Sequence, residues 1–167
     1  MSATSGHAAP RTWRRWRRKL LLRAVHAVFF LTRGMTLGVR AACFDAEGRI
    51  FLVRHGYVPG WHLPGGGVER GETAAQALAK ELREEGNLVL GDAPRLLQVY
   101  FNRAASRRDH VLLYVCRNVT QTAPRKPDAE IREADFFALD ALPPETTGST
   151  RRRLAEIAGT LSPDDVW

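Results

Sequence analysis

Apolar residues between positions 37 and 158 follow two spacings, one typical of strands and one typical of helices. Short alternating or continuous apolar runs predict five strands, over 37–45, 49–54, 95–102, 110–119 and 133–139. A turn at 45–48 joins the first two runs, so we expect them to pair as a β-hairpin. After the second strand, a loop over 57–60 and a run of glycines lead into a helix.

The helix after the glycine run has signals at both ends. Thr73 and Gln76 have the spacing of a capping box, in which a hydroxyl and an amide satisfy unpaired backbone donors. Gly86 and Asn87 are the residue types that best adopt a left-handed conformation beyond a last helical turn. A second helix is predicted over 144–158. Strands combined with one central and one later helix predict an α/β fold, with a mixed β-sheet between helices.

The acidic residues of the central helix lie on its apolar side. At about 100° per residue, Glu81, Glu84 and Glu85 share one side of the helical wheel. Leu78 and Leu82 lie on that same side, whereas a solvated charged face would point away from them. Three carboxylates turned inward repel one another and are costly to bury unpaired. A divalent cation relieves that cost, and hard oxygen ligands favour Mg²⁺ or Mn²⁺ over Zn²⁺.

Residues 66–88 resemble the Nudix box, in which Gly, five residues, Glu and seven residues precede Arg-Glu-aliphatic-x-Glu-Glu-x-Gly-aliphatic. The matching positions are Gly66, Glu72, Glu81, Leu82, Glu84, Glu85 and Leu88. Two positions depart from the pattern, because Lys80 stands where the family has Arg and Asn87 where it has the closing Gly. Lys for Arg replaces a bidentate donor with a point donor, which we expect to affect catalytic rate more than fold.

The resemblance implies a Nudix-type α/β/α sandwich over 37–160, preceded by an arm over 1–36 and followed by a tail over 161–167. It also implies a Mg²⁺-dependent hydrolase, with Mn²⁺ as a substitute metal. The implied metal ligands are Glu81, Glu84, Glu85 and the carbonyl oxygen of Gly66. Catalytic roles fall to Glu81 and Glu84, with Lys80 orienting Glu81. Glu130, in the loop before the last strand, is our candidate for the base that activates water; a solvated loop acid is an equally open interpretation.

Aromatic and basic residues near the strand ends are candidates for substrate binding. Tyr57, Trp61 and Phe101 are candidates for stacking on a base, although packing is the commoner role of such aromatics. Arg54 and Arg103 are candidates for contacting phosphate, and for Arg103 a solvated loop is the alternative. The sequence narrows these roles no further.

The resemblance implies hydrolysis of a nucleoside diphosphate-linked compound. The favoured substrate is a nucleoside triphosphate or its oxidised form, cleaved to monophosphate and pyrophosphate. A nucleotide-sugar, an ADP-ribose-type compound or a lipid-linked diphosphate is the alternative. A different class of function also stays open, namely a catalytically weak Nudix-fold module that binds its ligand, for which Lys80 is the one hint.

The net charge of +7 comes from the N-terminal arm. Residues 1–40 hold nine basic and no acidic residues, and the rest of the chain holds 16 basic and 18 acidic residues. Residues 12–32 have the spacing of an amphipathic helix. Packing on the domain or on a second subunit of a homodimer is one interpretation, and peripheral contact with an anionic membrane is another. Nucleic-acid contact and an export signal are less favoured.

Both cysteines lie in apolar runs. Cys43 and Cys116 are therefore expected to be buried free thiols rather than a disulfide. The composition, 44% hydrophobic and 26% charged, is ordinary for a soluble globular protein. The longest apolar run in the arm, over 20–31, is interrupted by charge and too short to span a bilayer. We accordingly expect a cytoplasmic protein.

Overall fold

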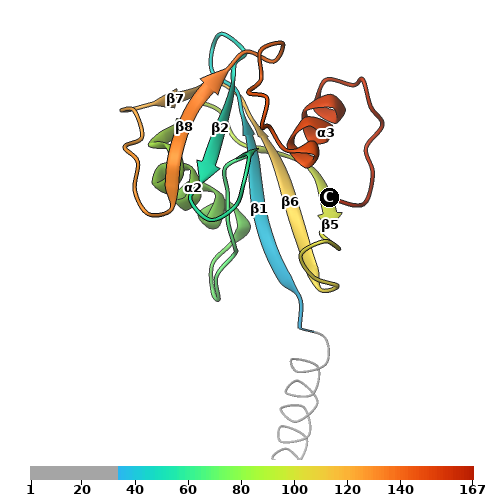
Figure 1. Ribbon diagram of the computed structural model, residues 1–167. Coiled ribbons are helices and arrows are strands. Elements are labelled where there is room, and N and C mark those ends of the chain that lie inside the picture. The colour runs from blue at the N-terminus through green and yellow to red at the C-terminus, as the bar shows by residue number, and fades with distance from the viewer. Residues whose placement is uncertain (1–33) are drawn as a thin grey trace, which may run out of the picture. The chain divides into compact units, whose positions relative to one another are not determined.

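Residues 34–167 are the part of the chain that the computed structural model describes (Figure 1). Their elements are β1 (Thr36–Cys43), β2 (Ile50–His55), β3 (Trp61–His62), α2 (Ala74–Gly86), β4 (Leu88–Leu90), β5 (Arg95–Phe101), β6 (Asp109–Cys116), β7 (Val119–Gln121), β8 (Ile131–Phe137) and α3 (Gly148–Ile157). None of the helices in this range is long and apolar enough to cross a membrane. The helix predicted over 12–32, and its proposed partners, lie outside the described residues.

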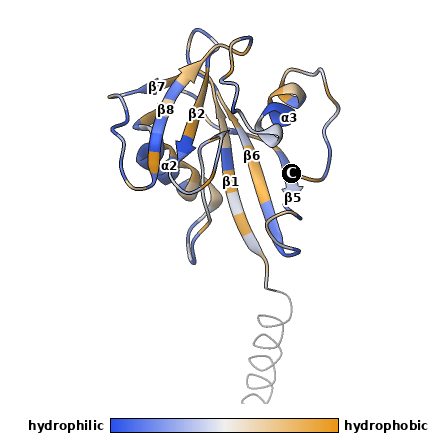
Figure 2. Cartoon of the chain, in the orientation of Figure 1, coloured by the Kyte–Doolittle hydropathy of each residue, from blue (hydrophilic) through white to orange (hydrophobic). Residues whose placement is uncertain are grey.

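From Val39 onward β1 is largely buried on both faces, as is most of β2, and a helix covers each face. Ala41 of β1 packs in a cluster with α2, whereas Ala42, the next residue, packs in a second cluster that includes Leu154 of α3. In β2, Val53 belongs to the α2 cluster and Leu52 to the α3 cluster. Successive strand side chains point to opposite faces, so the two helices bury both. Figure 2 shows the resulting hydrophobic stretches of β2 and β6.

The strands form a mixed arrangement, as predicted. β1 pairs with β6 in parallel, and β6 pairs with β5 in the antiparallel direction. β2 pairs with β3 and β8, antiparallel to both, and the short strands β4 and β7 pair with each other. Together with the two helices, this arrangement confirms the predicted α/β sandwich.

The predicted β-hairpin over 37–54 is wrong. The turn itself forms, because Asp45 N donates to Arg49 O at 3.1 Å and Phe44 bridges to Ile50. Beyond the turn the two strands separate, and β1 pairs along its whole length with β6. Turn chemistry is local, whereas strand pairing depends on which distant strands bury both faces, and the sequence pattern does not contain that information.

Several strand and helix boundaries also differ from the predictions. The strand predicted over 110–119 ends at Cys116, because Asn118 has a left-handed φ of 51° and Val119 begins β7. The predicted second helix begins at Gly148 rather than Pro144, with Thr147 as its N-cap. The last strand spans 131–137 instead of 133–139. β3 and β4 were not predicted, because two or three residues are too few to show a period.

The two cysteines lie opposite each other in the core. Cys43 of β1 and Cys116 of β6 are paired in the parallel register. Both are free and buried, which confirms the prediction from their apolar surroundings. Burial raises the pKa of the Cys43 thiol.

Candidate active site

The glycine loop over 64–67 lies against β1. Ala41 N donates to Pro64 O at 2.9 Å, and Val39 N donates to Gly66 O at 2.9 Å. A Cβ at Gly65 would lie 2.1 Å from Val39 O, and Gly65 has a φ of 138°. Only glycine can adopt this φ and also come this close to a backbone oxygen. Gly65 therefore lets the glycine loop run close to β1.

Helix α2 presents its acids to this loop. The predicted capping box is present, with Thr73 N donating to Gln76 Oε1 at 2.9 Å and Gln76 N donating to Thr73 Oγ1 at 3.2 Å. Asn87 ends the helix with a φ of 53° in the left-handed region, as expected from its residue type. Both ends of the helix therefore set the direction of its carboxylates.

Glu81 and Glu85 turn inward, and Glu84 does so much less. The buried Glu85 accepts a hydrogen bond from Gly65 N at 2.7 Å. A Cβ at Gly66 would lie 2.4 Å from Glu81 Oε1, so the carboxylate of Glu81 rests against a backbone without a side chain. The side chain of Glu84 is 57% exposed. Exposure to solvent therefore increases across the predicted acidic face, from the buried Glu85 to the exposed Glu84.

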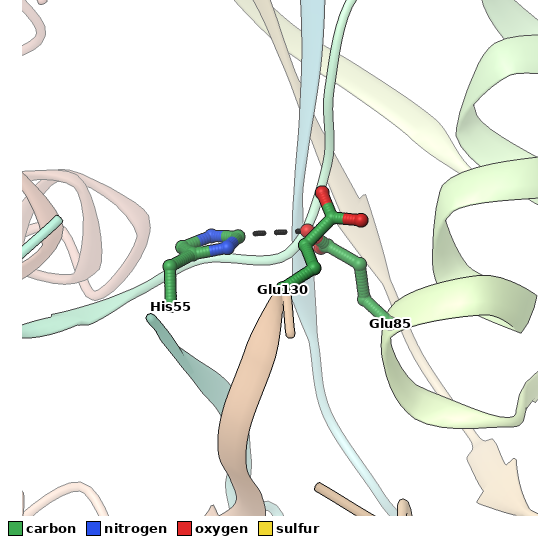
Figure 3. A group of neighbouring side chains, drawn as sticks. All are labelled: His55, Glu85 and Glu130. Carbon is green, nitrogen blue, oxygen red and sulfur yellow. Dashed lines mark ion pairs between the residues drawn. The ribbon is translucent and has the colours of Figure 1, made fainter. Parts of the chain in front are cut away.

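Three side chains from separate elements, including Glu85, lie close together (Figure 3). His55 from the end of β2, Glu85 from α2 and Glu130 from the loop before β8 each place a ligand atom within 4.8 Å of the others. His55 Nε2 lies 3.7 Å from Glu85 Oε1. From the sequence, Glu85 is a predicted metal ligand and Glu130 a candidate base, whereas His55 is interpreted only as a local hydrogen-bonding residue.

Burial shifts both members of the His55–Glu85 pair towards their neutral forms. Desolvation raises the pKa of Glu85 to about 7, although the Gly65 hydrogen bond and the nearby Arg40 charge act in the opposite direction. Desolvation, with Arg40 and His62 adding to it, lowers the pKa of His55 to about 4. An ordinary ion pair would shift both values the other way. Desolvation is therefore stronger than the attraction between the two groups.

Arg40 is a functional candidate that the sequence did not reveal, because it was counted with the basic arm. It lies in β1, where its Nη1 donates to Leu63 O at 2.9 Å. Its charge lowers the pKa values of Glu81 and Glu85, against the larger effect of their burial. The sequence signal that could have revealed Arg40 is an isolated arginine within an otherwise apolar strand, because a charged side chain in such a place needs a partner.

The loop that carries Glu130 is held by hydrogen bonds. Asp128 Oδ1 accepts from the backbone N–H groups of Glu130 and Ile131, both at 2.8 Å. Arg125 pairs with Asp128, and its Nε also donates to the carbonyl oxygen of Glu84 at 2.8 Å. The backbone hydrogen bonds and the Arg125 side chain hold the pKa of Asp128 near 2. These contacts link the Glu130 loop to the end of α2.

Lys80 contacts a different acid from the one predicted. Its Nζ lies 3.3 Å from Glu72 Oε1, and Glu72 also accepts from Glu69 N at 3.0 Å. The Lys80 charge lowers the pKa of Glu81 against the larger, raising effect of burial. The structure thus gives Lys80 a direct partner at the start of the box and an electrostatic effect on Glu81.

The predicted substrate-binding residues fall into three environments. Arg54 and Tyr57 line a cavity of about 540 Å³ that also borders His55. Arg54 there pairs with Glu133 at 2.7 Å. Trp61 is 7% exposed and packs edge-on against Phe137, with ring centroids 4.9 Å apart. Phe101 lies at the end of β5, where it bridges to Val166, and Arg103 is exposed in the next loop.

A second cavity, of about 270 Å³, borders the site at the glycine loop. Its lining includes Arg40, Gly66, Asn102, Asp109 and Trp167. The Asn102 side chain donates to Asp109 Oδ2 at 2.8 Å. None of the sequence patterns had pointed to Trp167, because its position depends on how residues 164–167 pack against β5.

The donor groups present fit a divalent metal ion. Carboxylate and carbonyl oxygens suit Mg²⁺ and Mn²⁺, and an imidazole nitrogen suits the transition metals. Glu81 and Glu85 both have raised pKa values caused first by burial, and a cation would stabilise their charged forms. The buried Nδ1 of His55 has no hydrogen-bond partner among residues 34–167. Contacts within the described residues therefore only partly offset the burial of the two carboxylates and of the imidazole.

Most of the described chain is similar to a known protein family. The model of the NUDIX domain matches residues 34–156. An ADP-ribose pyrophosphatase from Methanocaldococcus jannaschii is 37% identical over 81 residues, which are 48% of this chain and 47% of that protein. An RNA pyrophosphohydrolase from Halorhodospira halophila is 40% identical over 68 residues, 37% of this chain and 38% of that protein. The chain therefore spans less than half the length of either relative.

Solved structures give the same fold. A MutT NUDIX hydrolase from Burkholderia pseudomallei superposes with a TM-score of 0.62 and is 29% identical. The superposition covers 73% of this chain and 97% of the other. The central helix, the glycine loop and the strands described above thus belong to an arrangement that other proteins share.

Proposed function

The chain belongs to the NUDIX domain family, and on that premise we propose that it is a hydrolase of nucleoside diphosphate-linked compounds. The proposed reaction is attack of water on phosphorus and cleavage of a phosphoric anhydride bond. A divalent metal ion is the proposed cofactor, with Mg²⁺ as the favoured ion and Mn²⁺ as a substitute.

One observation carries the proposal, which is that acids from helix α2 and from the loop before β8 meet near the glycine loop. Glu85 contacts Gly65 N, Glu81 rests against Gly66, and Glu130 reaches the same place from the loop before β8. Such a set is costly to hold without a cation. When bound, a divalent ion neutralises phosphate charge and lowers the pKa of water.

We assign the metal ligands to Glu81, Glu85 and the carbonyl oxygen of Gly66, with Glu84 at the exposed edge of the site. The Gly66 carbonyl already accepts from Val39 N, which leaves one of its two lone pairs available. Glu130 is exposed and is held in place through its own backbone, so its carboxylate can accept the proton of the attacking water.

The two cavities support a substrate that has a group on each side of its diphosphate. One cavity borders the acids at His55 and offers Arg54, Arg132 and Tyr57. The other borders them at Gly66 and offers Trp167 with the Asn102–Asp109 pair. An aromatic ring with an amide and a carboxylate can stack on a nucleobase and pair with its edge. ADP-ribose and nucleotide-sugars have this two-ended form.

The second candidate substrate is a nucleoside triphosphate or its oxidised form, cleaved to monophosphate and pyrophosphate. The positive charge of Arg132 in the larger cavity favours it, because a guanidinium can receive a terminal phosphate, whereas Arg54 there is already paired with Glu133 and Glu145. The two candidates differ in what occupies the cavity at His55, a sugar or a pyrophosphate.

A substrate panel with two variants tests these proposals. The full chain is incubated with ADP-ribose, nucleotide-sugars, nucleoside triphosphates and oxidised triphosphates, with Mg²⁺ or Mn²⁺, and the products are separated by chromatography. We expect metal-dependent release of a nucleoside monophosphate, lost in Glu85→Gln and retained in the exposed control Glu47→Gln. Metal binding without turnover of any compound would instead favour a Nudix-fold binding module.

A further inference from the structure

We propose that His55 is a direct nitrogen ligand of the divalent metal ion, beside Glu85. The inference rests on the proposed function, because it concerns the metal of the same site. His55 lies outside the box motif that supplies the glutamates, at the end of β2.

The spacing of the groups suits shared coordination. Ligand atoms about 2.1 Å from one ion lie at most about 4.2 Å apart when they are on opposite sides of it. His55 Nε2 and Glu85 Oε1 are 3.7 Å apart, which is too long for a hydrogen bond and within that limit. Figure 3 shows the imidazole facing Glu85, with the Glu130 carboxylate beside them. Small side-chain movements therefore bring His55 and Glu85 to one ion, and the Glu130 carboxylate lies within 4.8 Å of both, close enough to act on water beside it.

Within residues 34–167, neither ring nitrogen of His55 makes a hydrogen bond of normal length. The residue is 8% exposed, and its Nδ1 has no hydrogen-bond partner in the described part of the chain. Its Nε2 lies 3.7 Å from Glu85 Oε1, and no other polar partner of Nε2 occurs among residues 34–167. A buried polar group without a partner is unfavourable. The unpartnered buried atom is Nδ1, and a cation would bind the other ring nitrogen, Nε2, which faces Glu85.

His62 provides a comparison within the same structure. Its ring lies 5.7 Å from that of His55, yet its Nε2 is 3.0 Å from Pro59 O, a normal hydrogen-bond distance. His62 is therefore satisfied by the protein, and it lies outside the group of possible ligands formed by residues 55, 85 and 130. The two histidines share residue type and neighbourhood but differ in partners.

A nitrogen ligand has a consequence for metal preference. Imidazole suits transition metals, whereas a site made of oxygen ligands alone suits Mg²⁺ and Ca²⁺ as well as Mn²⁺. We therefore expect His55 to increase the affinity for Mn²⁺ more than the affinity for Mg²⁺. Replacing His55 with Gln should weaken Mn²⁺ binding on the order of tenfold or more and change Mg²⁺ binding less.

The test is pulsed electron paramagnetic resonance of the full-length protein loaded with Mn²⁺, which detects a directly bonded nitrogen nucleus without requiring turnover. We expect a ¹⁴N coupling in the wild-type protein that is replaced by a ¹⁵N coupling after labelling with ¹⁵N-histidine. The coupling should disappear in His55→Gln and persist in His62→Gln. Because the labelled wild-type protein is itself informative, the test does not depend on the variant folding.

The outcomes separate this inference from the proposed function. Bound Mn²⁺ without a histidine nitrogen coupling overturns the role of His55 and leaves a metal site made of carboxylates. A coupling that persists in His55→Gln overturns it as well, because another nitrogen is then the ligand. Failure of the wild-type protein to bind Mn²⁺ or Mg²⁺ overturns both the inference and the proposed metal-dependent hydrolysis.

Discussion

At the scale of single residues, the properties of Glu85 follow from where the backbone places it. It is buried, receives one hydrogen bond from Gly65 and faces a histidine that burial keeps neutral. Its residue type and its place in the box were readable from the sequence. Its raised pKa was not, because burial in the folded chain causes it, against the opposing hydrogen bond from Gly65, which lies 20 positions away.

We predict that divalent metal affinity depends on pH through Glu85. A metal ion binds the carboxylate, so below the pKa of about 7 it must displace a proton, and above that pKa it need not. Affinity should rise about tenfold per pH unit up to about pH 7 and then level off. His55, with a pKa of about 4, is neutral throughout this range and adds no step.

Calorimetric titration with Mn²⁺ between pH 5.5 and 8.5 measures this dependence. The number of protons released per ion should fall from about one to near zero across pH 7. In Glu85→Gln the step should vanish together with much of the affinity. An affinity that does not change with pH in the wild-type protein would contradict the assignment.

We also predict that neighbouring glycines of the loop differ in their tolerance of alanine. A Cβ at Gly66 would lie 2.4 Å from Glu81 Oε1 and would push that carboxylate aside, whereas a Cβ at Gly67 meets no atom within 4 Å among residues 34–167. Gly66→Ala should therefore lose most of its activity while its melting temperature changes little. Gly67→Ala is the matched control and should keep both. Equal activity of the two variants would show that the position of Glu81 is unimportant.

At the scale of elements, the site depends on loops that the sequence pattern left without structure. Arg125 links the carbonyl of Glu84 in α2 to Asp128, and Asp128 in turn binds the backbone before β8. This arrangement presents Glu130. The elements themselves were largely predicted, because α2 and the longer strands have clear periods and caps. The contacts between loops have no period, so the sequence did not reveal them.

We predict that Asp128→Ala reduces turnover by displacing Glu130. Loss of the two backbone hydrogen bonds and of the Arg125 contact should loosen residues 125–131. A misplacement of about 1 Å in a catalytic group can cost up to about 100-fold in rate, so we expect a loss of tens of fold in kcat. Steady-state kinetics measure it, and Lys126→Ala in the same loop is the control. The double variant Glu130→Gln, Asp128→Ala separates the two roles. If its kcat equals that of Glu130→Gln alone, Asp128 acts through Glu130. Additive losses in kcat would contradict this role.

At the scale of the whole molecule, a buried polar network joins α3, β5 and residues 164–167. Arg153 is fully buried, pairs with Glu156 at 2.7 Å and donates to the carbonyl of Val166 at 3.0 Å. Tyr100 donates to Glu156 Oε2 at 2.7 Å. Its ring meets that of Trp167 edge-on at 5.5 Å. The network therefore holds Trp167 at the cavity beside Gly66.

We predict that Trp167→Ala weakens the binding of a nucleoside-containing substrate. Stacking on an aromatic ring contributes about 1–3 kcal/mol per base, so KM should rise roughly tenfold with a smaller change in kcat. Trp167→Phe should restore most of the affinity, since it retains a stacking surface. Kinetics with the best substrate from the panel give both values. A loss of kcat alone would place Trp167 outside the substrate site.

We predict that Arg153→Met lowers stability and also disturbs the cavity beside Gly66, because Arg153 contacts residues 166 and 167. Removing one member of a fully buried pair leaves the Glu156 carboxylate without its partner and costs about 3–5 kcal/mol. Chemical denaturation measures this cost. The double variant Arg153→Met, Glu156→Leu should recover part of the lost stability, because no charge is then left unpaired. Similar stabilities for the single variant and the wild-type protein would contradict the role of the network.

The sequence by itself determined the parts of this protein that depend on neighbours along the chain. The caps of α2, the spacing of the box acids, the burial of the cysteines and the sandwich class all follow from local period and residue type. The tertiary structure alone decided that β1 leaves β2 to pair with β6, that His55 joins the acids with the Arg40 charge nearby, and that Trp167 lines the cavity beside Gly66. These features depend on contacts between residues tens of positions apart, and a pattern along the chain does not contain such contacts.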